Sequence, residues 1–115
     1  MLKTLPQLIL ETTGHVRVLD AAQASTECRE RNGLLVDVRE PAEAQAKSPA
    51  GSHNIPRGVI EMKISTLCPD ADAKIYLHCA TGGRARLAAA QLLTMGYEDV
   101  TAISCSVDDV CAVFL

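Results

Sequence analysis

Apolar residues follow two patterns along this chain, short continuous runs and stripes with the spacing of a helix. The runs predict short strands of the kind buried on both faces of a parallel sheet, over residues 34–38, 74–78 and 100–103. An alternating segment predicts one more strand over residues 15–19. Helical spacing and capping residues predict helices over residues 5–12, 21–31, 41–46, 59–66 and 84–95, and a closing helix from residue 107 onward. Strands that alternate with helices are typical of an α/β domain, here with a mainly parallel sheet of about five strands and helices on both faces.

The ends of two helices carry specific signals. Asp20 is placed to cap the helix over residues 21–31, and Gly33 is predicted to end it. Gly96 is predicted to end the helix over residues 84–95 in the same way. Between two of the helices, Ser, Pro and Gly are frequent, which predicts a loop over residues 47–58.

The composition fits one globular domain and argues against several partners. The chain has 115 residues, of which 48% are hydrophobic, enough for a single domain with a buried core. A net charge of −3 and only three aromatic residues argue against a nucleic-acid partner. No apolar run reaches the roughly 20 residues of a membrane span, and the first residues make a poor signal peptide. We therefore expect a cytoplasmic protein without membrane contact, whose oligomeric state the sequence does not indicate.

The five cysteines give no sign of a disulfide framework or a metal site. Their number is odd, no C-x-x-C pair occurs, and no histidine has the spacing of a metal ligand. Cys28 and Cys111 fall on the apolar faces of predicted helices, so we expect them to be packing residues. No metal and no cofactor is predicted.

One segment carries candidate chemistry, His-Cys-Ala-Thr-Gly-Gly-Arg-Ala at residues 78–85. Cys79 follows a predicted strand, and ligands of parallel sheets bind beyond the carboxyl ends of strands. The pair Gly82 and Gly83 permits a curled backbone whose N–H groups point at one spot, an arrangement that binds anions. The predicted helix start and the guanidinium of Arg84 favour an anion as well. Such surroundings favour the thiolate of Cys79, so the loop predicts a nucleophilic cysteine.

Two simpler interpretations concern the same segment. Residues 78–85 could be no more than a tight turn between strand and helix around a buried thiol. His78 precedes Cys79 directly and is a candidate general base for it, but adjacent residues of a strand face opposite sides. We therefore expect His78 to point away from the thiol and to have a structural role.

Four segments together resemble the rhodanese family of single-domain sulfurtransferases. They are LVDVREP at 35–41, NIPRG at 54–58, CATGGR at 79–84 and LLTMGYEDV at 92–100. The resemblance covers about residues 15–103 and implies one rhodanese-like domain over residues 1–115. Residues 1–14 would then be an N-terminal extension, and residues 104–115 a divergent C-terminal segment.

The resemblance implies that Cys79 carries sulfur as a persulfide. The donor would be thiosulfate, another small sulfur-containing anion or a protein persulfide, and the acceptor a thiol or cyanide. Arg84 would shape the anion site. Backbone N–H groups of one loop would hold the terminal sulfur, the loop Ala80, Thr81, Gly82, Gly83 and Arg84. Asp37, Arg39 and Arg57 would support this loop, or they would equally form a structural set of salt bridges.

The sequence departs from the family pattern in three places and leaves two other functions open. Residues 47–51 lack the family's Gly-His-Ile segment, Ala85 replaces a frequent serine, and residues 104–106 replace a Gly-Gly pair before a Trp-bearing helix. Phosphatases and arsenate reductases of the same fold are similar but have a C-x5-R loop, one residue longer than the loop here. The shorter loop favours sulfur transfer. The second alternative is a non-catalytic binding module, but such modules tend to lose the cysteine that this chain has.

Cys105 is a candidate second thiol. It follows the strand over residues 100–103 as Cys79 follows the strand over residues 74–78. The resemblance to the rhodanese family implies that these two strands are neighbours, which would bring the two residues close together. Cys105 could then attack a Cys79 persulfide and form a disulfide. The alternative is that Cys105 is a small residue that fills a turn.

Overall fold

The computed structural model describes residues 1–115 and contains six α-helices, five strands and one short 3-10 helix. In chain order these elements are α1 (Leu5–Thr12), β1 (Arg17–Leu19), α2 (Ala21–Arg31), β2 (Leu34–Asp37), α3 (Pro41–Ala46), β3 (His53–Asn54), η1 (Arg57–Val59), α4 (Ile60–Leu67), β4 (Lys74–His78), α5 (Gly83–Met95), β5 (Asp99–Ile103) and α6 (Val107–Val113).

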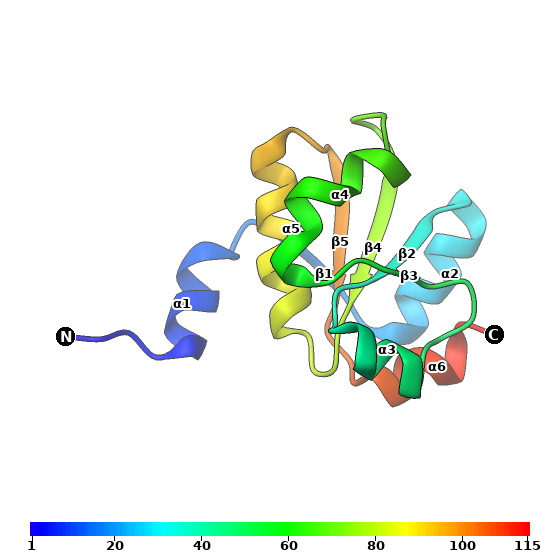
Figure 1. The fold of residues 1–115 in the computed structure, drawn as a ribbon, viewed down its shortest axis with the longest axis horizontal. Coiled ribbons are helices and arrows are strands. Elements are labelled where there is room, and N and C mark those ends of the chain that lie inside the picture. Colours follow the sequence, from blue (N-terminus) through cyan, green and yellow to red (C-terminus); the bar gives the residue numbers. More distant parts are fainter.

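The sheet is parallel throughout, with the strand order β1-β5-β4-β2-β3. α4 and α5 lie on one side of it and α2 and α6 on the other, while α1 stands outside α5 (Figure 1). The predicted α/β class, the five-stranded parallel sheet and the helices on both faces are therefore confirmed. None of the helices has the length and apolar character that a membrane crossing requires.

Each face of the sheet has its own hydrophobic core. Alternate residues of β4 divide between the two, because successive side chains of a strand point to opposite faces. Ile75 and Leu77 belong to the core under α4 and α5, as does Cys79, whereas Tyr76 belongs to the core under α2 and α6. This alternation places Cys79 on the α5 side and turns His78 toward the other side, as the sequence predicted.

Two local predictions were wrong in detail. The predicted loop over 47–58 contains β3 and the start of η1, because His53 and Asn54 pair with the edge of β2. A strand of two residues has no periodicity, so the sequence does not show it. The residue that ends α2 in a left-handed conformation is Asn32, with φ 55°, and not Gly33. Position 33 favours glycine for a steric reason, because a Cβ there would lie 2.6 Å from the ring of Tyr76.

The turn from β4 to α5 depends on Gly82. Its φ of 101° lies in the region that residues with a side chain rarely adopt, and a Cβ there would lie 3.1 Å from the carbonyl oxygen of Ser104. Gly83, the first residue of α5, has ordinary dihedral angles, and its added Cβ would lie 3.4 Å from Cδ1 of Ile9 in α1. Only one glycine of the pair is therefore required by the backbone.

A buried ion pair closes the end of β2. The Arg39 side chain donates to both carboxylate oxygens of Asp37, at 2.7–3.1 Å, and both side chains are almost fully buried. Arg39 also donates to the carbonyl oxygen of Lys47. The Asn54 amide donates to the carbonyls of Asp37 and Arg39, at 3.0 and 2.9 Å, which fixes the chain as it leaves the sheet.

His78 is fully buried beside this ion pair. Its Nε2 lies 2.8 Å from the hydroxyl oxygen of Ser52, and its Nδ1 has no hydrogen-bond partner. Burial lowers the pKa of His78 from the usual 6.5 to about 4; Asp37 opposes this effect and Arg39 adds to it. The imidazole is therefore neutral near pH 7 and serves the packing of the strand end.

We expect Gly82→Ala to destabilise the fold and Gly83→Ala to leave it nearly unchanged. At Gly82 the strained backbone alone costs roughly 1–3 kcal/mol, and the contact with Ser104 adds to that cost. At Gly83 the substitution gains helix propensity and meets only an ordinary contact. Urea unfolding of the two variants beside the wild type measures the difference. Equal losses of stability would contradict the assignment of the turn to Gly82.

We expect the free energy of unfolding to fall as the pH drops from 6.5 to 4, partly because of His78. In this window the unfolded chain binds a proton at His78 that the folded chain excludes, which costs on the order of 3 kcal/mol at full effect. Carboxylates contribute to the same trend, so the test is a comparison with His78→Gln. Urea unfolding at several pH values should show a slope against pH that is shallower in the variant by about one proton. Parallel slopes would show that His78 does not titrate in this way.

Candidate active site

Cys79 lies at the carboxyl end of β4, with its sulfur inside the turn that leads to α5. The backbone N–H of Gly82 donates to Cys79 Sγ at 3.0 Å, and the backbone N–H of Ala85 donates at 3.4 Å. Only 1% of the residue is exposed. Two N–H groups at the start of a helix, directed at one sulfur, form a site that favours negative charge.

The two N–H groups that reach Cys79 Sγ come from one predicted loop residue and from one residue beyond the loop. Of the five predicted loop residues, Gly82 donates to Sγ, while the second donor, Ala85, lies just beyond the predicted set. Thr81 is exposed. The carbonyl of Ala80 accepts from the N–H of Val107 at 3.2 Å, which ties the loop to the start of α6.

Arg84 is held by a carboxylate, which the sequence analysis did not foresee. Its two terminal nitrogens donate to the two carboxylate oxygens of Glu43 in α3, at 2.7 and 3.0 Å. Both side chains are a little more than one third exposed. The guanidinium lowers the pKa of Glu43 to about 2. The hydrogen bonds to Glu43 raise the pKa of Arg84, and burial opposes this effect.

The supporting residues predicted from the sequence separate into two places. Asp37 and Arg39 form the buried pair at the end of β2, next to the end of β4. Arg57 lies on η1 and donates to Glu61 in α4, at 3.2 Å. The three residues are therefore not one salt-bridge set, and Arg57 is bound to a carboxylate outside the loop.

The structure does not bring the Cys105 thiol to Cys79. Cys105 Sγ accepts a hydrogen bond from the N–H of Ala21 at 3.2 Å, at the start of α2. It packs against the core under α2 and α6, whereas Cys79 belongs to the core under α5. β4 and β5 are neighbours, as predicted, but their following cysteines turn to opposite faces of the sheet.

Two of the three remaining cysteines lack the features of a reactive thiol. Cys28 and Cys68 are buried, and burial raises the pKa of both. Cys28 is a core residue as predicted, while Cys111 is half-buried and belongs to neither core. No group of three or more His, Cys, Asp or Glu side chains is placed to hold a metal ion.

A hollow of about 500 Å³ borders the outer side of the loop. α1 forms its apolar wall, and the loop with the start of α5 forms the other. The lining residues are Leu5, Pro6, Ile9, Leu10, Thr81, Gly82, Gly83 and Arg86. The N-terminal segment is therefore a neighbour of the loop and not a remote extension.

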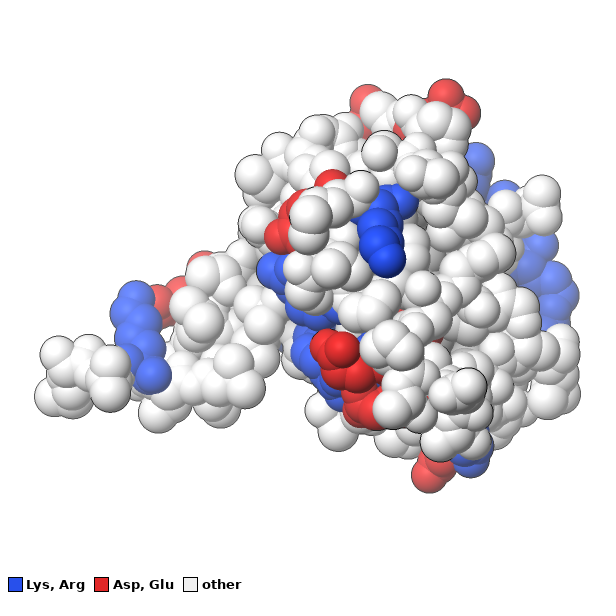
Figure 2. All heavy atoms as spheres, viewed as in Figure 1, with Lys and Arg blue, Asp and Glu red and all other residues white.

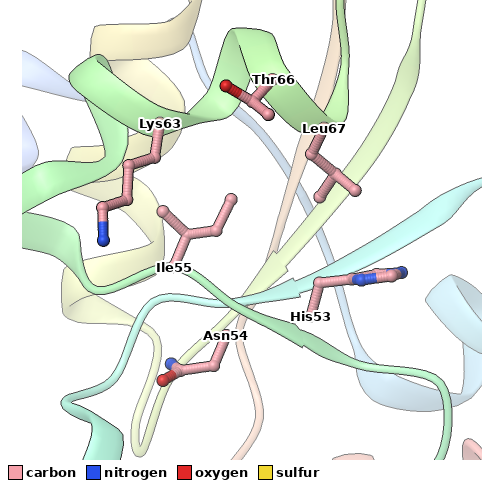
Figure 3. A pocket seen from close by; sticks show the side chains of 6 residues that line it. All are labelled: His53, Asn54, Ile55, Lys63, Thr66 and Leu67. Carbon is pink, nitrogen blue, oxygen red and sulfur yellow. The ribbon is translucent and has the colours of Figure 1, made fainter.

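A second hollow of about 500 Å³ lies between β3 and α4, with Lys63, Thr66 and Leu67 on one side and His53, Asn54 and Ile55 on the other (Figure 3). None of its lining residues belongs to the Cys79 loop, and none is a cysteine. It offers no thiol, so Cys79 and its loop remain the candidate active site.

Glu43 is the site residue that the sequence analysis missed, although a signal for it exists. It is the third residue of the helix that follows β2, and its Oε2 also accepts from the N–H of Glu40 at 2.9 Å. Because β2 pairs with β4, a carboxylate in the first turn of α3 lies near the loop after β4. A search for carboxylates in the first turns after neighbouring strands would have found it.

Several solved structures are similar to this chain. A protein of unknown function from Rhodopseudomonas palustris, described as a possible tyrosine phosphatase, has a TM-score of 0.81 and 24% identity, over 92% of this chain and 87% of that one. A rhodanese-related protein from Thermoplasma volcanium is 29% identical over 84% of this chain and 91% of that one, with a TM-score of 0.68. A rhodanese with anions from E. coli is 28% identical over 67% of this chain and 89% of that one, with a TM-score of 0.63.

Curated protein sequences give no match to this chain. A family model does match, the one described as the rhodanese-like domain, over residues 19–112. The match includes the strand ends, the Cys79 loop and the helix that carries Glu43. It spans well over half of the sequence, and the chain therefore belongs to the rhodanese-like domain family.

Proposed function

We propose that this protein is a sulfurtransferase that carries a sulfane sulfur on Cys79. The observation that supports this most strongly is the placement of Cys79 Sγ, which accepts from the N–H groups of Gly82 and Ala85 at the positive end of α5. A thiolate held in this way is both nucleophilic and stabilised. The same donors suit the terminal sulfur of a persulfide, which is also an anion.

Sulfur transfer in this site takes two substitutions at sulfur. In the first, the Cys79 thiolate attacks the outer sulfur of the donor; a bond forms from Sγ to that sulfur, and the bond inside the donor breaks. The electron pair leaves with sulfite when the donor is thiosulfate, or with a thiolate when the donor is a persulfide. In the second, a thiol or cyanide attacks the outer sulfur, and the electron pair returns to Cys79 Sγ. No external oxidant or reductant is needed.

The loop favours this chemistry over phosphoryl transfer. Four residues separate Cys79 from Arg84, and the loop leaves only 1% of Cys79 exposed. A single sulfur atom beyond Sγ needs less room than a tetrahedral phosphoryl group. The description of the R. palustris structure as a possible phosphatase comes with 24% identity, so that likeness concerns the fold. A binding module without catalysis would need neither the thiol nor the two N–H groups directed at it.

We expect Cys79→Ser to abolish sulfur transfer while the protein stays folded, because a hydroxyl is neither acidic nor polarisable enough to carry sulfur. Thiocyanate formation from thiosulfate and cyanide, and mass spectrometry of sulfur-loaded protein, measure the loss. Thermal unfolding followed by circular dichroism shows whether the variant is folded. Substantial turnover by folded Cys79→Ser protein would remove Cys79 from the mechanism.

The matched control is Cys105→Ser, which changes the other cysteine that follows a central strand. Because the Cys105 thiol bonds to the start of α2 and not to the loop, we expect this variant to retain sulfur transfer. Non-reducing peptide mapping of sulfur-loaded wild-type protein completes the test. A Cys79–Cys105 disulfide, or a loss of activity in Cys105→Ser, would show that Cys105 takes part in the mechanism.

A further inference from the structure

We propose that the preferred donor is an organic persulfide of low charge rather than thiosulfate, and that Glu43 sets this preference by occupying Arg84. The proposal rests on the sulfurtransferase function proposed above. It names the chemical class of the donor and one residue that determines specificity.

Three arginines near the loop each have a carboxylate partner. Arg84 is bound through both terminal nitrogens to Glu43, Arg39 is bound to Asp37, and Arg57 is bound to Glu61. On the face shown in Figure 2, acidic atoms lie beside a strip of basic atoms near the centre, while basic atoms near the right edge have no acidic neighbours. At these three positions an incoming anion therefore meets a guanidinium group that already has a carboxylate partner, and Arg86, at the hollow beside the loop, is the exception.

Glu43 competes directly with an anionic donor. A carboxylate bound through two parallel N–H···O contacts occupies the edge of the guanidinium that a sulfonate group would use. Glu43 is also held in place by its contact with the N–H of Glu40. A thiosulfate ion would have to displace a carboxylate that belongs to the protein and is already positioned.

The charge balance of the two possible loading steps differs. With thiosulfate, a thiolate and a dianion react and a sulfite dianion has to leave, so three negative charges gather at the sulfur. With an organic persulfide, RS–S⁻, Cys79 Sγ bonds to the outer sulfur, the S–S bond breaks and RS⁻ leaves with the electron pair. Two negative charges gather at the sulfur in this step, one fewer than with thiosulfate. A site whose guanidinium groups are neutralised by carboxylates therefore favours the persulfide.

The hollow beside the loop fits the same class of donor. Four of its lining residues are apolar and come from α1, and its one charged residue, Arg86, takes part in no ion pair of the structure. Such a wall suits the carbon body of an organic donor, with room for a single negative charge near Arg86. A small thiol and a protein cysteine can both present a persulfide of this kind.

The experiment compares three donors on three proteins. The donors are thiosulfate, 2-hydroxyethyl persulfide, and a peptide that carries a persulfidated cysteine. The proteins are the wild type, Glu43→Gln and the matched control Glu40→Gln, which removes a neighbouring carboxylate that does not contact Arg84. Glutamine at position 43 can still accept from the N–H of Glu40. The rate of Cys79 loading is followed by rapid-quench mass spectrometry, with kcat and KM determined separately.

We expect the wild type to load from 2-hydroxyethyl persulfide at least about tenfold more efficiently than from thiosulfate. In Glu43→Gln the thiosulfate reaction should gain about tenfold in kcat/KM, mostly through a lower KM, as expected for one released charge-assisted contact. The gain should shrink at high salt, because it depends on a partly exposed charge. Glu40→Gln should leave the ratio between the donors unchanged.

Each outcome decides a separate point. Loading from none of the donors would refute the sulfurtransferase function itself. If the wild type loads as efficiently from thiosulfate as from the persulfides, the proposed donor class is wrong but the sulfurtransferase function stands. This comparison needs no variant. Equal effects of Glu43→Gln on all donors would show that Glu43 only supports the fold. Faster loading from the peptide than from 2-hydroxyethyl persulfide would identify a protein as the source of the persulfide, and the reverse order a small thiol.

Discussion

The turn at Gly82 has to fit between the sulfur of Cys79 and the backbone of Ser104, and the candidate site depends on this fit. Gly82 donates its N–H to the sulfur on one side, and on the other it approaches Ser104 too closely for a side chain. The turn therefore determines where α5 begins and which N–H groups reach Cys79. It also sets the position of Arg84, two residues further on. A parallel sheet makes this arrangement possible, because it brings the ends of β4 and β5 to the same edge.

Around this turn, charge is balanced by pairing. The buried Asp37–Arg39 pair holds the end of β2, and the more exposed Glu43–Arg84 pair holds α3 against the loop. Buried pairs of this kind are weak evidence for stability, but they fix geometry, because removing one partner leaves an uncompensated charge. The hydrogen bonds that Cys79 Sγ itself accepts come from backbone N–H groups and not from charged side chains.

The sequence was sufficient to predict the architecture because the informative signals were local. Apolar runs marked β2, β4 and β5, and capping residues marked the helices, so most boundaries lie within two residues of the prediction. The position of Cys79 and the orientation of His78 followed from strand geometry alone. β3 was not predicted because a two-residue strand is defined only by its pairing with β2. The partners of Arg84, Arg57 and Cys105 were not predicted because each partner lies on another element of the fold. A local sequence pattern does not indicate which side chains from different elements come into contact.

The order of strands in the sheet has a consequence for how the chain folds. β1 is the first strand in the sequence, yet its single neighbour is β5, the last. As the chain leaves the ribosome, β1 has no strand to pair with until residue 103 has been made. The sheet is therefore completed by a contact between the two ends of the sequence, and such non-local pairing makes folding slow relative to proteins built from local contacts. Until that contact forms, the exposed side of β5 remains an unpaired edge next to the strand that carries Cys79.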